Sequence, residues 1–156
     1  MTIKSFRGQM TPGSVQTINL ATYNGSKGYK INKLQIINKT PHGVDSTLVC
    51  KIFTIPQTAA SVSATIDFSD NTLLGCAIYE DQANKSSPPQ GYETVIFDNM
   101  VFNQDIYITM ADADGNTDPG NYYIELEQMS LSLDENTVAT LKDIRNIKSQ
   151  WVNNII

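Results

Sequence analysis

The chain is short of charge, of basic residues and of long apolar runs, and each shortage excludes a class of protein. Charged residues make up 17% of the chain, and 11 basic side chains stand against 16 acidic ones. This acidic balance, without a basic run, disfavours binding to nucleic acid or to an anionic membrane. No stretch approaches the roughly 20 apolar residues of a membrane span, and residues 1–10 lack the apolar core of a signal peptide. We therefore expect a soluble protein made in a cytoplasm.

The chain also has few of the residues and motifs that most enzymes use for catalysis. It holds two cysteines and one histidine. Cys50 and Cys76 lie within apolar runs, which favours two buried free thiols over a disulfide or a nucleophile paired with His42. The serine-hydrolase, phosphate-loop, dinucleotide-binding and zinc-protease motifs are absent, so we expect no enzyme and no cofactor. A hydrolase with paired carboxylates stays an alternative, because sequence does not give the distances between acidic side chains.

What the chain does contain is a series of short apolar–polar alternations separated by turn residues, which predict about eight strands. The expected strands are Val15–Ala21, Gly28–Asn38, Thr47–Thr54, Val62–Phe68, Leu73–Tyr79, Thr94–Phe97, Asp105–Met110 and Tyr122–Met129. Since no helix lies between them to make parallel crossovers, the sheets should be antiparallel. We expect one all-β domain over residues 1–131, an antiparallel β-sandwich of jelly-roll type.

Local patterns refine this expectation at three places. The alternation of Val62–Phe68 places Ile66 and Phe68 on the buried face of a strand. Within Gly28–Asn38 the alternation changes phase near Lys33, which suggests a β-bulge. The polar residues Glu80–Gly91 should form a long exposed loop, because their proline and serine content does not suit packing.

Residues 132–156 differ from the rest because their pattern is helical. Ser132 and Glu135 fit a capping box, and an apolar stripe at helical spacing follows them. This C-terminal amphipathic α-helix and its tail must be covered, either by the protein's own sheet or by a neighbouring subunit or a shell. The residues expected at such a contact are Leu141, Ile144, Ile147, Trp151, Val152, Ile155 and Ile156.

One loop spaces its oxygen-bearing side chains as a calcium site does. Asp112, Asp114, Asn116 and Asp118 alternate like the early ligands of an EF-hand loop. The glycine and the final glutamate of that loop do not match, and Asp-Gly and Asp-Pro pairs are ordinary turn residues. A plain solvated loop is therefore expected, with weak calcium binding by these four residues as the alternative.

Several segments together carry a family resemblance that extends from Lys4 to about Arg145. They read GYKINKLQIINKTP, LVCKIFT, LLGCAIYED, GYETVIFDNMVFNQDIYI, NYYIELEQMSL and ENTVATLKDIRN. In these segments the chain resembles small virion structural proteins of marine tailed phages, which infect cyanobacteria and other ocean bacteria. None of the segments is a catalytic motif.

The resemblance implies a non-enzymatic protein that is carried in many copies on a virion and assembled in the host cytoplasm. The first expectation is a capsid decoration or cement protein whose partners are copies of itself and the major capsid protein or another virion protein. The second is a tail or fibre component that binds host carbohydrate. A hydrolase acting on a cell-surface polymer is the third and least favoured.

Overall fold

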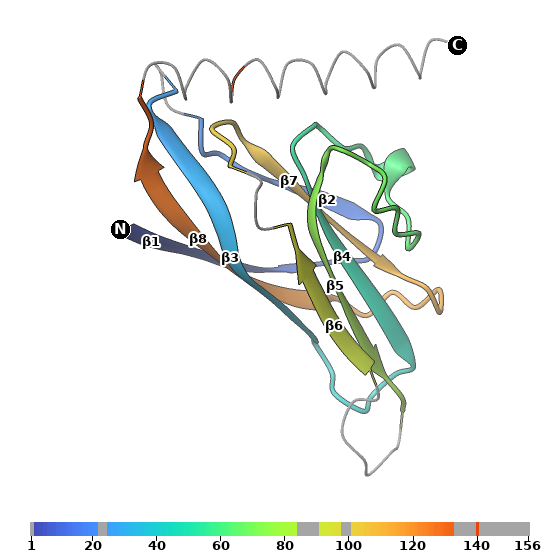
Figure 1. Cartoon of the computed structure of the whole chain (residues 1–156). Helices are drawn as coiled ribbons and strands as arrows, with labels where there is room; N and C mark the ends of the chain where they lie inside the picture. Colours follow the sequence, from blue (N-terminus) through green and yellow to red (C-terminus); the bar gives the residue numbers. More distant parts are fainter. Residues whose placement is uncertain (1, 22–24, 84–90, 98–100, 133–139, 141–156) are drawn as a thin grey trace, which may run out of the picture.

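A computed structural model of the chain describes residues 2–21, 25–83, 91–97, 101–132 and 140, which form eight strands in two antiparallel sheets (Figure 1). The strands are β1 Thr2–Met10, β2 Ser14–Ile18, β3 Lys27–Asn38, β4 Ser46–Phe53, β5 Leu73–Asp81, β6 Gly91–Ile96, β7 Ile106–Asp112 and β8 Gly120–Ser130. The predicted all-β, antiparallel class is therefore confirmed. Within the described ranges, no helix has the length and apolar character needed to cross a membrane.

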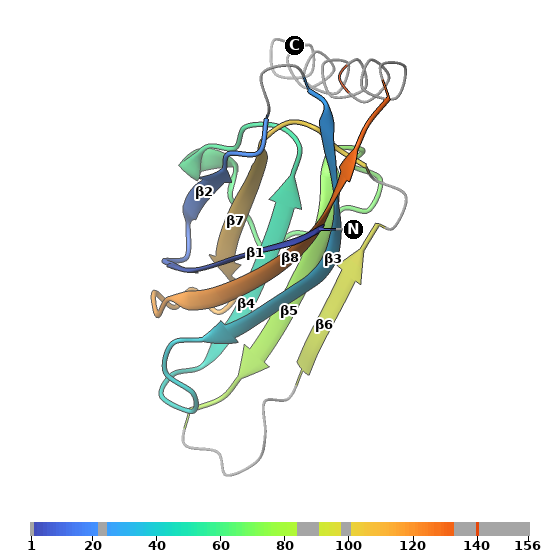
Figure 2. The same ribbon diagram turned by 90° about the vertical axis from the view of Figure 1, so that its left-hand side faces the viewer.

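The two sheets differ in size and share one core. Sheet A has three strands in the order β1-β8-β3, and sheet B has five in the order β2-β7-β4-β5-β6. Figure 2 shows sheet A crossing in front of sheet B. Alternate residues point between the sheets, so that Ile124 and Leu126 of β8 join Ile106, Ile108 and Met110 of β7 in a single buried cluster. Burial of these side chains, at about 1.5–3 kcal/mol each, holds the two sheets together.

Seven of the eight predicted strands overlap strands of the structure. The expected irregularity in β3 is also present, because its register against β8 shifts between Ile31 and Lys33. The extra residue at this bulge, Asn32, is exposed. It allows Ile31 before it and Leu34 after it both to point into the core, although they are three positions apart.

The strand predicted at Val62–Phe68 is wrong. The segment follows a short 3₁₀ turn at Ala59–Ser61 and pairs with no strand among the described residues. Its alternation holds as far as Ile66, which is half-buried while its neighbours Thr65 and Asp67 are exposed. Phe68, predicted on the same buried face, is 56% exposed. The segment lies against the outer face of β4, where the Lys51 ammonium donates to the Thr65 carbonyl oxygen at 2.6 Å. One-sided burial thus produces a period of two without a hydrogen-bonded ladder.

Two further differences concern strand β1 and the loop between β5 and β6. Sequence alternation did not predict β1, whose first four residues are exposed and therefore show no apolar face. The expected loop Glu80–Gly91 is shorter than predicted, because β5 continues through Asp81 and β6 begins at Gly91. Asp81 is paired with Ser46 and is 1% exposed, so a residue assigned to solvent belongs to the interior.

The C-terminal helix predicted over 132–156 lies outside the described residues, apart from Ser132 and Thr140. So do all seven residues predicted to make the subunit or shell contact. Thr140 contacts the domain that the sheets form, since the buried Asn103 amide donates to its hydroxyl at 2.9 Å. The same amide donates to the Gly25 carbonyl oxygen at 3.2 Å.

Candidate functional site: a hollow on the outer face of sheet A

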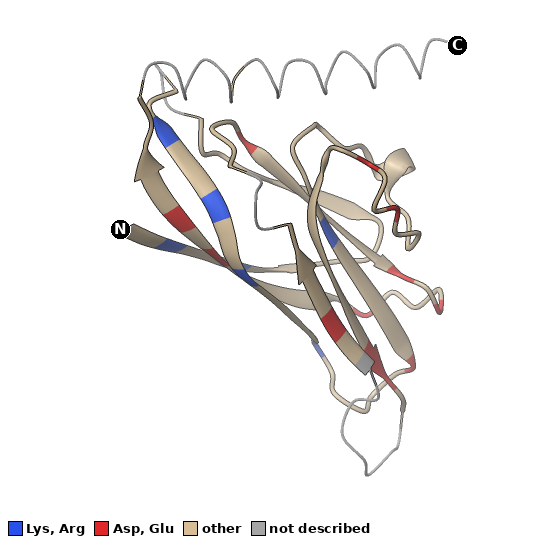
Figure 3. Cartoon of the chain, viewed as in Figure 1, with Lys and Arg blue, Asp and Glu red and all other residues tan. Residues whose placement is uncertain are grey.

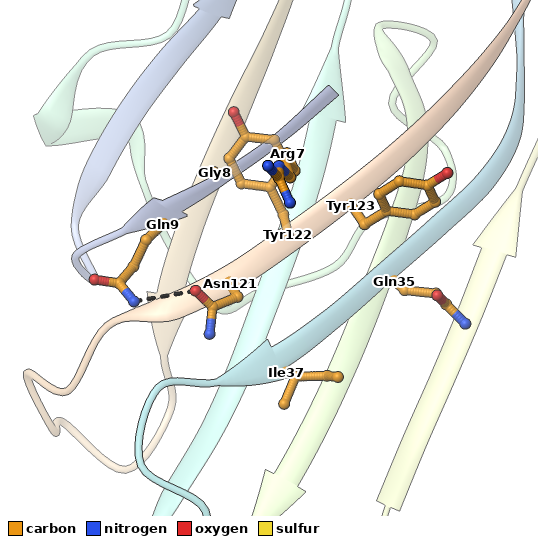
Figure 4. A pocket seen from close by; sticks show the side chains of 8 residues that line it. All are labelled: Arg7, Gly8, Gln9, Gln35, Ile37, Asn121, Tyr122 and Tyr123. Atoms are coloured by element: carbon orange, nitrogen blue, oxygen red, sulfur yellow. Dashed lines mark hydrogen bonds between the residues drawn. The ribbon is translucent and has the colours of Figure 1, made fainter. Parts of the chain in front are cut away.

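A hollow of about 490 Å³ lies on the face of sheet A that points away from the core (Figure 4). All three strands of the sheet contribute to it, with β8 in the middle. Its lining consists of one cation, three side-chain amides, two tyrosines, an isoleucine and a glycine, namely Arg7, Gln9, Gln35, Asn121, Tyr122, Tyr123, Ile37 and Gly8. A concave surface of this size, with a few polar groups among apolar atoms, is the usual form of a small-molecule site.

Strand register explains why these residues lie together. Gln9, Asn121 and Ile37 occupy one row across the three strands, and Arg7, Tyr123 and Gln35 occupy another two residues further along. Members of one row share a face of the sheet and stand within about 5 Å of the next strand's side chain. Two rows of three side chains therefore converge on a single surface.

The first row contains a direct contact between two amides. The Gln9 Nε2 atom donates to Asn121 Oδ1 at 3.0 Å, which fixes the relative orientation of both side chains. This bond leaves Gln9 Oε1 as an acceptor and Asn121 Nδ2 as a donor, neither with a partner among the described residues. The row thus presents one acceptor and one donor to the outside.

The second row is organised by Tyr123. Its hydroxyl donates to Glu125 Oε1 at 2.7 Å, and the Lys33 ammonium lies 5.9 Å from the centre of its ring. The hydrogen bond to Glu125, whose negative charge also disfavours a phenolate, raises the pKa of Tyr123. The ring is consequently held in place and stays neutral at physiological pH.

The floor of the hollow depends on a glycine. Tyr122 points toward the core, and its hydroxyl donates to Gln16 Oε1 at 2.6 Å. A Cβ atom at Gly8 would lie 2.9 Å from the Tyr122 ring, closer than non-bonded carbon atoms approach. The absence of a side chain at position 8 therefore lets the Tyr122 ring lie directly beneath β1.

Charge is distributed unevenly between the two sheets (Figure 3). Among the described residues, β1, β3 and β8 carry five basic side chains and two acidic ones, whereas the rest carries two basic and ten acidic. Sheet A is therefore the positive part of an acidic protein, which favours a negatively charged ligand there over one on sheet B.

The candidate calcium residues are used differently. The Asp112 Oδ1 atom accepts from the backbone amides of Thr47 and Asp114, and Asp118 Oδ1 accepts from the Thr40 hydroxyl. The other carboxylate oxygens of Asp112 and Asp118 are buried without a hydrogen-bond partner. Over the described ranges, no group of three or more His, Cys, Asp or Glu is arranged to hold a metal. The contacts of Asp112 and Asp118 tie this loop to the chain around Thr40 and Thr47, and the choice between a plain loop and a weak calcium site stays a prediction.

Sequence reasoning missed a buried polar cluster around Asp81. This carboxylate accepts from Asn38 Nδ2 at 2.8 Å, from the His42 backbone amide at 2.7 Å and from the Gln82 amide at 2.9 Å. Burial alone would raise the pKa of Asp81, but these hydrogen bonds outweigh it and lower the pKa. No sequence pattern marked this cluster, and its effect is seen only in the structure, where it holds His42 in a left-handed backbone conformation (φ 58°).

The cysteines are buried free thiols, as predicted. Burial, with a smaller contribution from the nearby Cys76, raises the pKa of Cys50 to about 12. A nucleophilic cysteine needs the opposite shift. His42 Nδ1 is engaged elsewhere, 3.3 Å from Asp81 Oδ1 and 3.2 Å from the Gln82 carbonyl oxygen, so it does not activate either thiol.

The chain matches neither a protein-family model nor a curated protein. The resemblance of its sequence to phage virion proteins therefore stays an expectation.

Proposed function

We propose that this protein is a non-enzymatic structural subunit of a phage virion, a capsid decoration or cement protein that stabilises the shell. In this proposal the two sheets form a β-sandwich of jelly-roll type, and residues 132–156 form an amphipathic helix and tail. Its partners are copies of itself and the major capsid protein or another virion protein. Neither nucleic acid nor membrane is a partner.

The strand order carries the proposal. A jelly roll of eight strands places β1-β8-β3-β6 opposite β2-β7-β4-β5, and the observed order differs from it only in β6, which stays beside β5. The Thr94 hydroxyl of β6 nevertheless reaches the Leu34 carbonyl oxygen of β3 at 3.2 Å, which supports the jelly-roll reading. Jelly rolls recur in viral capsid and lectin domains. Because one fold hosts many functions, the strand order supports a structural protein of this kind but does not identify an activity.

An open groove supports a role in assembly. Between the edge strands β3 and β6 lies a groove of about 690 Å³, which exists because sheet A has two strands fewer than sheet B. Ile37 and Tyr92 line it and are 54% and 76% exposed. Exposed apolar side chains beside two strand edges are typical of a surface that a partner covers.

The copy number of the protein in purified particles tests the proposal. We expect quantitative mass spectrometry to find about one copy per major capsid subunit or per few subunits, since a decoration protein follows the shell lattice. A dozen copies or fewer would favour a tail component instead. Absence of the chain from the particle would overturn both structural readings, and release of sugars from host-surface polymer by the purified protein would favour a hydrolase.

The C-terminal segment offers a second prediction, for the residues proposed to contact the shell. A variant that ends at Gln150 lacks Trp151, Val152, Ile155 and Ile156. We expect it to stay folded and soluble but to lose self-association and binding to particles, because a partner covers these apolar residues. Analytical ultracentrifugation and particle pull-down measure the two effects.

A lower melting temperature with assembly unchanged would contradict this expectation and would show that the segment covers the protein's own sheet. No change in either quantity would contradict both readings. A variant with Asn153 and Asn154 replaced by serine is the matched control, because it keeps the apolar residues and should behave as wild type.

A further inference from the structure

Arg7 is the one cation on the outer face of sheet A that has no acidic residue opposite it. The other two cations of this face, Lys33 and Lys30, stand opposite Glu125 and Glu127 of β8, whereas Arg7 stands opposite Tyr123. No hydrogen bond or ion pair joins the Arg7 guanidinium to any other described residue. A guanidinium presents paired donors that match a carboxylate in a bidentate contact.

The neighbours of Arg7 suit a ligand rich in hydroxyl groups. A sugar hydroxyl is both a donor and an acceptor, and the Gln9–Asn121 pair offers one free acceptor and one free donor side by side. Gln35 adds a third amide across Tyr123 from Arg7, and Figure 4 shows it on β3, apart from the Gln9–Asn121 pair. Tyr123 supplies a ring whose hydroxyl is already bonded to Glu125, so its apolar face is what it offers.

From these observations we propose that the hollow on the outer face of sheet A binds a carboxylate-bearing saccharide, such as a uronic-acid residue of a polymer. Arg7 binds the carboxylate, the Gln9–Asn121 pair and Gln35 bind hydroxyls, and Tyr123 packs against the sugar ring. This site goes beyond the structural role proposed above and does not depend on it. A virion subunit that carries it would hold the particle near acidic polysaccharide.

Two features distinguish this ligand from other anions. Nucleic acids and sulfated polymers bind through rows of cations, while the lining of this hollow contains a single one. An acidic peptide would have little use for three side-chain amides held on strands, since its own backbone pairs with a strand edge and not with a sheet face. The amides lie on a paired central strand and its two neighbours, which are rigid supports for a site.

Titration calorimetry at low salt with three probes tests the proposal. We expect tri-galacturonate to bind the wild-type protein, and its fully methyl-esterified form to bind at least about tenfold more weakly, because esterification removes the carboxylate charge and leaves the hydroxyls and the sugar ring in place. Arg7→Gln should weaken tri-galacturonate binding by at least about tenfold as well. Triglutamate, the third probe, should bind no better than the ester.

Lys4→Gln is the matched control variant. It removes the same charge from the same strand, but Lys4 pairs with Leu126 on the opposite face of sheet A, so tri-galacturonate affinity should stay within about twofold of wild type. Urea unfolding of both variants checks that the fold is kept. Equal binding of acid and ester, equal binding of triglutamate, unchanged affinity in Arg7→Gln, or no binding of tri-galacturonate by the folded wild type would each overturn the proposal.

Discussion

Replacing Phe102 with alanine should lower the free energy of unfolding by about 3–5 kcal/mol, whereas the same change at Phe68 should cost about 0.5 kcal/mol. Phe102 is 1% exposed and stacks on Tyr29 with ring centres 6.1 Å apart. Phe68 is 56% exposed and touches only the edge of Phe97 among aromatic rings of the described chain. Removal of the buried ring leaves a cavity between the sheets, and removal of the exposed ring leaves none.

The backbone of Phe102 also pairs with that of Tyr29 through two hydrogen bonds. Its amide donates to the Tyr29 carbonyl oxygen at 3.0 Å, and the Tyr29 amide donates back at 2.7 Å. These bonds should survive the substitution, so the loss measured in the alanine variant reports the side chain. Urea denaturation followed by circular dichroism gives both free energies. Equal losses at the two positions would contradict the assignment of Phe102 to the core.

Replacing Asp81 with alanine should cost about 3–5 kcal/mol, because the change leaves buried donors without an acceptor. The donors are the Asn38 side-chain amide and the backbone amides of His42 and Gln82. Asp45 provides the control. It is exposed, and among the described residues its carboxylate accepts only the Ala83 amide, at 2.8 Å, so Asp45→Ala should cost about 1 kcal/mol or less. Urea unfolding at pH 7 measures both.

The contribution of Asp81 should depend on pH in a defined direction. Its pKa is lower in the folded chain than the ordinary value of 3.8, so at low pH the unfolded chain binds this proton first and stability rises with pH. The stabilisation is fully present above the ordinary pKa and is lost as the pH falls through the lower, folded value. The difference in unfolding free energy between wild type and Asp81→Ala should therefore narrow only below about pH 4. A difference that is constant down to pH 2 would contradict this assignment.

The hollow on sheet A illustrates how far sequence reasoning reaches. The alternation of Tyr122–Met129 predicts that Tyr122 and Tyr123 point to opposite faces, and the structure agrees, since Tyr122 is buried and Tyr123 is half-buried. The partners of Tyr123 could not be predicted. Arg7 and Gln35 come from strands more than 80 residues away along the chain, and β1 showed no pattern of its own.

The sequence by itself determined which segments are extended and which face of each one is apolar, because a period of two depends only on local burial. It also determined that the thiols are buried, since this follows from the apolar residues beside each of them. Tertiary structure alone decided that Val62–Phe68 lies on β4 without pairing, that β1 joins β8, and that Asp81 anchors the loop around His42. Each of these depends on hydrogen bonds between residues distant in sequence. The period of apolar residues along the sequence carries no information on which partner a strand or a carboxylate will find.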